Sequence, residues 1–130
     1  MKAVQDISRD IAVLIVDDEP LFVEMIQAML ASESDIDVVA TARDGRVAVN
    51  LATELDPDVI VMDVSMPVMD GIDATQRIRE RDPRACILIL TGGTASSDVD
   101  RARKAGAAAY MTKDRIATDL IVEIRKLGSQ

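Results

Sequence analysis

The sequence predicts an α/β fold, in which five parallel strands form one sheet with helices on both of its faces. Three observations predict this fold. Short apolar runs alternate with segments of helical period along the chain. Three of these runs are almost continuously apolar, as are strands that are buried on both faces of a parallel sheet. With 130 residues, the chain is long enough for one domain with a single core.

Five runs are expected to be strands, at residues 11–16, 36–42, 58–62, 86–90 and 107–111. The first, third and fourth runs are the most apolar, and we expect them in the centre of the sheet. The second and fifth runs are mixed or rich in alanine, which suits edge strands. With right-handed crossovers, this distribution is compatible with the strand order 2-1-3-4-5 of a flavodoxin-like, doubly wound (βα)5 sheet.

The first two helices are predicted from the spacing of apolar residues. Pro20 stands near the first turn of the first helix, where proline is tolerated. The apolar face of this helix follows the spacing i, i+3, i+4, i+7 and i+8 through Phe22, Met25, Ile26, Met29 and Leu30. The second helix is marked by Val47, Leu51 and Leu55.

The last three helices are expected in the second half of the chain. Ala74 and Ile78 mark the third helix. The fourth, at 97–105, has small residues and few apolar ones, and Gly106 is well placed to end it. The fifth, at 115–127, presents an apolar face that consists of Ala117, Leu120, Ile121 and Ile124. The domain is therefore expected to fill residues 11–127, between a polar leader at 1–10 and a short tail at 128–130.

Composition excludes several classes of function. The net charge of −8 and the pI near 4.4 argue against direct binding of nucleic acid by this chain, because phosphate contacts need clustered Lys and Arg. No apolar run is long enough to span a bilayer, and the first residues lack the apolar region of a signal peptide, so we expect a cytoplasmic protein that does not bind membranes. The single cysteine, Cys86, is expected to be a buried core thiol.

Polar residues gather where the central strands end. Asp17, Asp18 and Glu19 follow the first strand, and Asp63 ends the third. The fourth strand ends at Thr91, which Gly92 and Gly93 follow, and the fifth ends near Tyr110, with Lys113 shortly beyond it. Because the carboxyl ends of parallel strands meet at one edge of a sheet, we expect a set of polar groups to lie together there. This set consists of the carboxylates of Asp17, Asp18 and Asp63, the Thr91 hydroxyl and the Lys113 ammonium.

This set of residues can bind a metal and a phosphoryl group. Three neighbouring carboxylates repel one another and have raised pKa values unless a cation offsets their charge. Mg²⁺ is the favoured cation because it prefers oxygen ligands, whereas the absence of histidine argues against zinc and copper. With a metal, the Lys113 ammonium and the Thr91 hydroxyl around a phosphoryl group, Asp63 can attack it in line. Singly, each residue has a plainer structural interpretation, but their joint position favours the functional one.

Four stretches resemble the receiver domains of two-component response regulators, and they occur in the order VLIVDDEP, MDVSMPVMDG, LTGG and KAGAAAYMTK. They lie between residues 13 and 113, so the resemblance covers nearly the whole chain. It implies that Asp63 accepts a phosphoryl group from a phosphohistidine on a sensor histidine kinase or a phosphotransfer protein. Similar receivers often form homodimers, through helices one and five or through helices four and five, and the sequence does not decide between these faces.

The resemblance also implies the roles of individual residues around the phosphoryl group. Asp18, Asp63 and the backbone carbonyl of Ser65 would bind Mg²⁺ directly, and Asp17 would act mainly through water. Lys113 would contact the phosphoryl oxygens.

A conformational switch is implied as well. Thr91 would move toward the new phosphoryl group, Tyr110 would turn inward, and the surface made by helix four, strand five and helix five would change. The weakly apolar fourth helix suits a movable element. Many receivers have proline after the lysine, whereas Asp114 follows Lys113 here, as in the subfamily whose receivers precede a helix-turn-helix DNA-binding domain. The local loop geometry stays open.

Two alternatives belong to other classes. A Mg²⁺-dependent phosphatase or phosphotransferase with an aspartyl nucleophile would, in the haloacid-dehalogenase-like pattern, need an acid two residues after Asp63, where Ser65 stands. A phosphorylation-independent binding module would be favoured by the loss of Asp18, Asp63 or Lys113, all of which are present. Because no output domain follows the last helix, we expect either a stand-alone receiver or a piece of a longer regulator.

Overall fold

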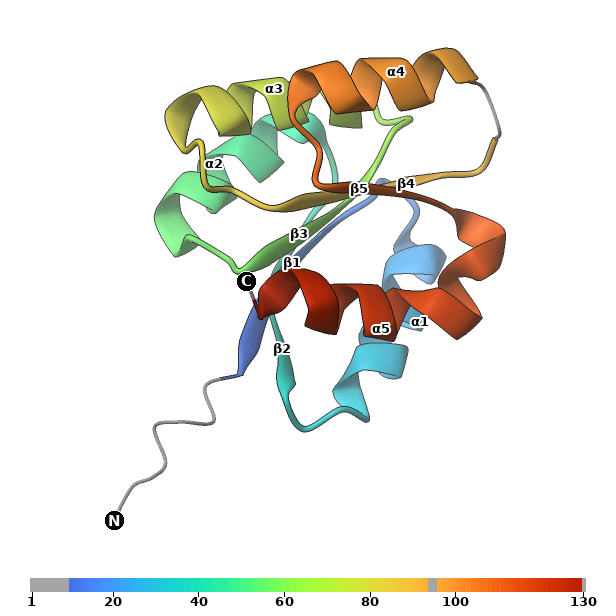
Figure 1. Ribbon diagram of the computed structural model, residues 1–130. Coiled ribbons are helices and arrows are strands. Elements are labelled where there is room, and N and C mark those ends of the chain that lie inside the picture. Colours follow the sequence, from blue (N-terminus) through green and yellow to red (C-terminus); the bar gives the residue numbers. More distant parts are fainter. Residues whose placement is uncertain (1–9, 94–95, 130) are drawn as a thin grey trace.

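A computed structural model describes residues 10–93 and 96–129 of the chain (Figure 1). Five parallel strands form one sheet in the order β2-β1-β3-β4-β5, which confirms the predicted fold class and strand order. The strands are β1 (Ile11–Val16), β2 (Ile36–Ala42), β3 (Val59–Asp63), β4 (Ile87–Thr91) and β5 (Ala109–Thr112). The helices are α1 (Pro20–Ala31), α2 (Gly45–Leu55), α3 (Gly71–Arg81), α4 (Ser96–Ala105) and α5 (Ile116–Gly128), with a 3-10 turn, η2 (Lys113–Arg115), before α5. Within these residues, no helix is both long and apolar enough to cross a membrane.

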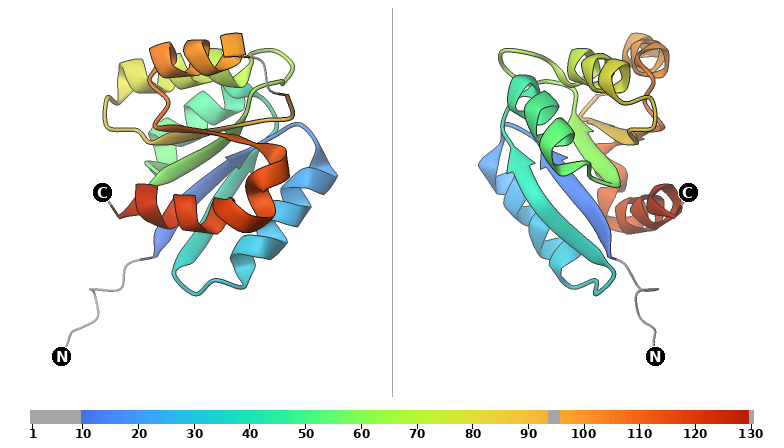
Figure 2. Two further views of the ribbon diagram at one scale, coloured as in Figure 1. Left: turned by 45° about the vertical axis from the view of Figure 1, so that its right-hand side comes forward. Right: turned by 90° about the vertical axis from the view of Figure 1, so that its left-hand side faces the viewer.

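The sheet separates two helical layers. Figure 2 shows α1 and α5 on one face, and α2, α3 and α4 on the other. Side chains of β1 alternate between them: Val13 and Ile15 join the apolar cluster under α1 and α5, whereas Leu14 and Val16 join the cluster under α2, α3 and α4. The central strands are continuously apolar because each of their two faces is covered by helices. The edge strand β2 instead alternates between buried and more exposed residues, as predicted for an edge.

The strands end slightly later than their apolar runs. Asp63 is the last residue of β3 and pairs with Leu90, and Thr91 is the last residue of β4 and pairs with Thr112. Both polar side chains are therefore fixed by the sheet itself. At the other end of β4, Cys86 precedes the first strand residue and is only partly buried, which corrects the expectation of a fully buried thiol.

The predicted faces of α1 and α5 are partly correct. Ile26 and Leu30 are fully buried, but Met25 is 45% exposed and Val23 packs against the core in its place. On α5, Ile116 is buried, whereas the expected Ala117 is exposed. Apolar residues extend around much of these two helices, so spacing alone does not select the face that packs.

The second helix is confirmed as α2, but of the three apolar residues that predicted it only Leu51 packs against the core. Val47 and Leu55 are about two-fifths exposed, at 40% and 41%, and the helix buries Gly45, Ala48 and Val49 instead. Small residues are needed there because α2 packs closely on the neighbouring loop. A Cβ added at Gly45 would lie 2.5 Å from the backbone oxygen of Met69.

The ends of α4 and α5 fit the expectations in part. Gly106, with a φ of 99°, directly follows α4 in the left-handed conformation expected of a helix stop. Helix α5 continues to Gly128, one residue into the expected tail, and this glycine packs closely against Ile11 at the start of β1. The expected leader lies almost entirely outside the described residues.

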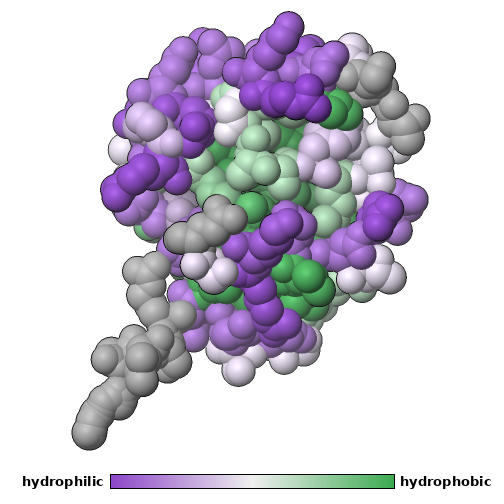
Figure 3. All heavy atoms as spheres, in the orientation of Figure 1, coloured by the Kyte–Doolittle hydropathy of each residue, from purple (hydrophilic) through white to green (hydrophobic). Residues whose placement is uncertain are grey.

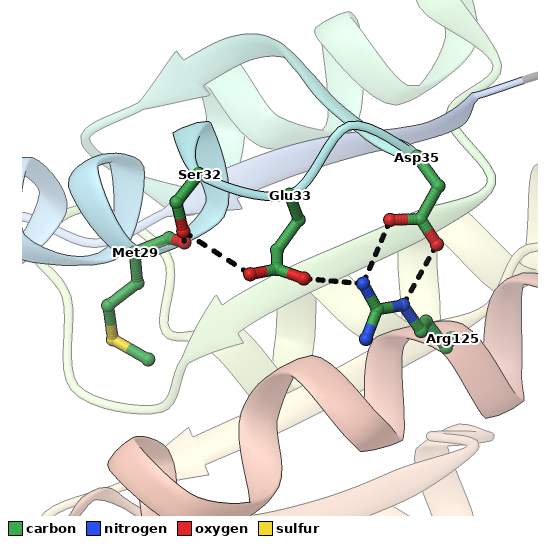
Figure 4. Close-up of polar contacts among 5 residues, drawn as sticks. All are labelled: Met29, Ser32, Glu33, Asp35 and Arg125. Carbon is green, nitrogen blue, oxygen red and sulfur yellow. Dashed lines mark hydrogen bonds and ion pairs between the residues drawn. The ribbon is translucent and has the colours of Figure 1, made fainter.

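A cluster of charged residues joins α5 to the turn between α1 and β2 (Figure 4). The Arg125 guanidinium donates two hydrogen bonds to the Asp35 carboxylate, at 2.8 and 3.0 Å, and a third to Glu33. The side chains of this surface cluster remain well exposed, at 44% for Arg125 and 47% for Asp35.

Candidate functional site

The polar strand ends meet in one cleft, as predicted. The cleft has a volume of about 570 Å³ at the carboxyl end of the sheet and is lined by Asp17, Asp18, Glu19, Asp63, Val64, Ser65, Thr91, Gly92, Gly93, Asp98 and Lys113. Every residue that was predicted to bind the metal or to contact the phosphoryl group lines this cleft. A larger groove, of about 650 Å³, lies around Cys86 at the opposite end of the sheet. The cleft at the carboxyl end is the candidate site, because three of its acids lie close enough together to share a cation. No other such group of acids occurs in the described part of the chain.

Asp63 occupies a rigid position on the floor of this cleft. It is the last residue of β3 and is only 6% exposed. The loop after it folds back, and the Gly71 amide donates a hydrogen bond of 2.8 Å to the Val64 carbonyl. A Cβ added at Gly71 would lie 2.0 Å from the backbone oxygen of Asp63, so this position requires glycine. Gly71 stands in the stretch MDVSMPVMDG, but the sequence pattern predicts no role for it.

The Lys113 ammonium lies between two of the acids. Its Nζ is 3.2 Å from Asp17 Oδ2 and 3.2 Å from Asp63 Oδ1. Asp17 and Lys113 are 96 residues apart in the sequence, and the parallel sheet brings them together. The same Nζ lies over the ring of Phe22, 4.1 Å from its centroid. Sequence reasoning assigned Phe22 to the core and missed this contact.

Burial dominates the electrostatics of Asp63. It raises the pKa of the carboxyl from 3.8 to about 6, with a further increase from the negative charge of Asp17 and a partial offset by Lys113. For Lys113, burial lowers the pKa, but the attraction of Asp63 and Asp17 outweighs this effect and the pKa is raised. The pKa of Asp63 is thus raised, as expected, but mainly by burial and only secondarily by the repulsion among carboxylates that the sequence predicted.

The three acids can share a cation. Asp17, Asp18 and Asp63 each offer an oxygen, and these atoms lie within 4.8 Å of one another. Asp17 is nearly fully buried, and its two oxygens accept hydrogen bonds from the Glu19 amide at 2.9 Å and from Lys113 at 3.2 Å. Asp18 is exposed to the cleft. These oxygen donors suit a hard cation such as Mg²⁺, with Asp18 and Asp63 more available to it than Asp17.

Thr91 and Tyr110 lie in different surroundings. Thr91 is 5% exposed at the edge of the cleft, and its hydroxyl accepts a hydrogen bond of 3.2 Å from the Gly93 amide. Tyr110 does not line the cleft: it packs against the cluster under α2, α3 and α4. Its hydroxyl is buried and has no hydrogen-bond partner among the described atoms. An added Cβ at Gly92 or Gly93 would meet no described atom within 4 Å, so the cleft is open on this side.

Helix α4 contributes a residue that sequence reasoning missed. Asp98, in the first turn of α4, lines the cleft. Arg101 links it at 3.4 Å to Asp70 at 3.2 Å, and the Asp70 side chain caps α3 by accepting a hydrogen bond from the Asp73 amide. The weak apolar pattern of α4 gave no signal for this contact. Its packing on the core depends on Ala102 and Ala105, which are both buried.

The loop geometry after β5 is now defined. Lys113 begins the 3-10 turn η2, and the described residues contain no cis peptide bond, so Asp114 follows Lys113 through a trans peptide. The turn places Lys113 at the cleft and Asp114 in an exposed position.

Comparison with known proteins gives a consistent result. Residues 13–125 match the family model of the response regulator receiver domain. The transcriptional regulatory protein DegU of Brevibacillus brevis is 38% identical over 120 residues, which are 92% of this chain and 50% of that protein. The chain spans about half the length of the curated relatives it matches.

Solved structures agree with this match. A two-component response regulator of the LuxR family from an Aurantimonas species has a TM-score of 0.88 at 34% identity, over 92% of this chain and 86% of that one. A chain of the CheX–CheY–BeF3–Mg²⁺ complex of Borrelia burgdorferi has a TM-score of 0.82 at 27% identity, over 95% of this chain and 91% of that one.

Proposed function

The chain belongs to the response regulator receiver family, and from this premise we propose that it is a phosphorylation-activated signalling switch. In this proposal, Asp63 accepts a phosphoryl group from a phosphohistidine on a sensor histidine kinase or a phosphotransfer protein. One observation carries the proposal: the buried Asp63 carboxylate lies 3.2 Å from the Lys113 ammonium and beside two further acids that can share a cation. A general acid or a structural ion pair does not need a carboxylate, an ammonium and a cation site together, whereas phosphoryl transfer uses all three.

We assign the metal site to Asp18, Asp63 and the backbone carbonyl of Ser65, with Asp17 acting through water. The hydrogen bonds that both Asp17 oxygens already accept support this division. Mg²⁺ is the cation, and when bound it supplies positive charge for the phosphoryl oxygens. The relative from Borrelia burgdorferi, whose complex contains BeF3 and Mg²⁺, supports the choice of metal.

Asp63 acts as the nucleophile in this scheme. An oxygen of its carboxylate attacks phosphorus, and the bond from phosphorus to the histidine nitrogen of the donor breaks as the new bond forms. Lys113 contacts the transferred oxygens, and its present position 3.2 Å from Asp63 supports this role. Without a bound cation the pKa of Asp63 is about 6, so the carboxylate is already largely ionised at neutral pH, and a cation beside it favours the ionised form further.

Thr91 and Tyr110 transmit the change to the surface. Thr91 moves toward the phosphoryl group, and Tyr110 takes the space that Thr91 vacates. They lie on neighbouring strands, and the Tyr110 hydroxyl has no hydrogen-bond partner among the described residues, so no such bond has to break when the side chain turns. The responding surface is the one made by α4, β5 and α5, where Figure 3 shows a weakly apolar area between hydrophilic residues. Transcription regulation is the output we propose, because the matched relatives include transcriptional regulators about twice as long as this chain.

The test is the intact mass of the chain after incubation with Mg²⁺ and a small acyl phosphate donor. We expect one added phosphoryl group on the parent and none on Asp63→Asn or on the parent in the presence of a metal chelator. The matched control is Asp56→Asn, at the opposite end of the sheet, where the left-handed φ of 46° suits asparagine. An adduct on Asp63→Asn, or an adduct that forms equally well with the chelator present, would contradict the proposal.

A further inference from the structure

We propose that Phe22 is a positioning residue that holds the Lys113 ammonium in place for phosphoryl transfer. The inference rests on the proposed function and extends it to a residue outside the acid and hydroxyl set. Its basis is the contact between Nζ and the ring face, with 4.1 Å between Nζ and the ring centroid. A cation within about 6 Å of a ring centroid is attracted by the negative face of the ring.

The ring completes the surroundings of the ammonium. Nζ contacts Asp17 and Asp63 at 3.2 Å each, and the side chain of Lys113 is only 25% exposed. The ring attracts the cation without accepting a strong hydrogen bond. The N–H donors therefore stay available for the two carboxylates and, after transfer, for phosphoryl oxygens.

The position of the ring is itself fixed by the fold. Phe22 lies in the first turn of α1, which begins at Pro20 directly after the acidic loop. The ring packs partly buried against the cluster under α1 and α5. Lysine has a flexible four-carbon stem, and a fixed attractive surface beside it reduces the freedom that it must lose on contacting the phosphoryl group.

An aliphatic residue would fill the same space without attracting the cation, and this difference makes the inference testable. The variants are Phe22→Leu, which keeps an apolar side chain, and Phe22→Tyr, which keeps the ring. Met29→Leu is the matched control, because it lies on the same helix about two turns further along and also packs against the same cluster. Circular dichroism and urea denaturation identify any variant that does not fold, and Phe22→Met replaces Phe22→Leu in that case.

The first readout is the rate of phosphorylation by a small acyl phosphate donor with Mg²⁺. We expect Phe22→Leu to react about three-fold more slowly than the parent, Phe22→Tyr to keep a rate within about two-fold of the parent, and Met29→Leu to match the parent. A folded Phe22→Leu that reacts at the parent rate would overturn the inference, as would an equal loss in Phe22→Tyr.

The second readout is the NMR spectrum of the unphosphorylated protein. The chain has one Phe, one Tyr and no Trp, so a ring-current shift of the Lys113 methylene protons next to Nζ is easily assigned. We expect these protons to be shifted upfield in the parent and to return to their ordinary position in Phe22→Leu. Ordinary shifts in the parent would overturn the inference. Because this readout needs no phosphorylation, a parent chain that accepts no phosphoryl group would refute the proposed function separately.

Discussion

Lys113 contacts Asp17 and Asp63 at the carboxyl end of the sheet, and Arg125 contacts Asp35 and Glu33 on the surface beside α1 and α5. Each cluster has one cation and two acids. They differ in burial: the Asp63 side chain is 7% exposed, whereas that of Asp35 is 47% exposed. The pKa of Asp63 is raised to about 6, mainly by burial, while the hydrogen bond from Arg125 lowers the pKa of Asp35.

Burial, and not the presence of a cation, decides the sign of the pKa shift in these two clusters. At the surface, water solvates the charges and a well-placed guanidinium only adds attraction. In the cleft, desolvation and the repulsion among acids exceed what one ammonium returns. The cleft therefore holds negative charge that is incompletely neutralised, which lowers the stability of the fold. The same charge attracts an incoming cation, as is typical of functional sites.

The largest expected effect comes from removing the buried cation. Lys113→Met leaves Asp17 and Asp63 together without a counter-charge, and we expect the free energy of unfolding at pH 7 to fall by about 2–3 kcal/mol. This is below the range for fully buried pairs because Lys113 is partly exposed. Urea denaturation in metal-free buffer measures the change, with the exposed Lys126→Met as control. Equal stability of Lys113→Met and the parent would show that the ammonium does not offset the acids.

A smaller effect, of opposite sign, is expected from neutralising the buried acid. Asp63→Asn removes a carboxyl group whose pKa is raised from 3.8 to about 6 in the folded protein. By linkage this shift corresponds to roughly 3 kcal/mol, which solvent screening near the cleft reduces to about 1–2 kcal/mol. We expect the variant to be more stable than the parent by this amount at pH 7 without metal.

The pH dependence sharpens this prediction. A group with a raised pKa binds its proton more tightly in the folded state, so its contribution to stability is most favourable below pH 4 and is lost as the pH rises through about 6. The advantage of Asp63→Asn should therefore shrink toward zero between pH 7 and pH 4. Urea denaturation at several pH values measures it, and an advantage that stays constant over this range would argue against a raised pKa.

The smallest effect is expected at the surface cluster. Arg125→Gln removes the cation that Asp35 and Glu33 share, and we expect a small loss of stability at pH 7 that disappears in high salt. Because the pKa of Asp35 is lowered, its contribution is present above pH 3.8 and is lost as the pH falls through the folded value. Denaturation at low and high salt tests this, with Arg84→Gln as an exposed control. A loss that persists in high salt would remove the contrast between the two clusters.

Much of the fold and the site could be predicted because both depend on short local patterns. Buried strands appear as apolar runs, and the residues that end those runs must meet at one edge of a parallel sheet. Asp17, Asp63, Thr91 and Lys113 were found in this way. The packed faces of α1 and α2 could not be found so well, because Met25 and Val47 fit a helical stripe as well as their buried neighbours do.

Other features depend on contacts that no local pattern contains. The contact of Phe22 with Lys113 joins α1 to the turn after β5, and the position of Asp98 at the cleft depends on how α4 packs against α3. The value of the Asp63 pKa likewise depends on burial, which the residue type does not reveal. Gly71 stands in one of the stretches that carry the family resemblance, but its close approach to Asp63 is visible only in three dimensions.

The glycines around the cleft have a consequence for how this molecule can evolve. A methyl group at Gly71 would collide with the backbone of Asp63, so nearly every mutation there is expected to be purged by selection. At Gly92 and Gly93 a side chain would enter open space. The backbone contact behind Asp63 therefore tolerates little change, whereas the segment after Thr91 tolerates more, and variation among descendants of this sequence would accumulate beside Thr91 while the nucleophile stays in place.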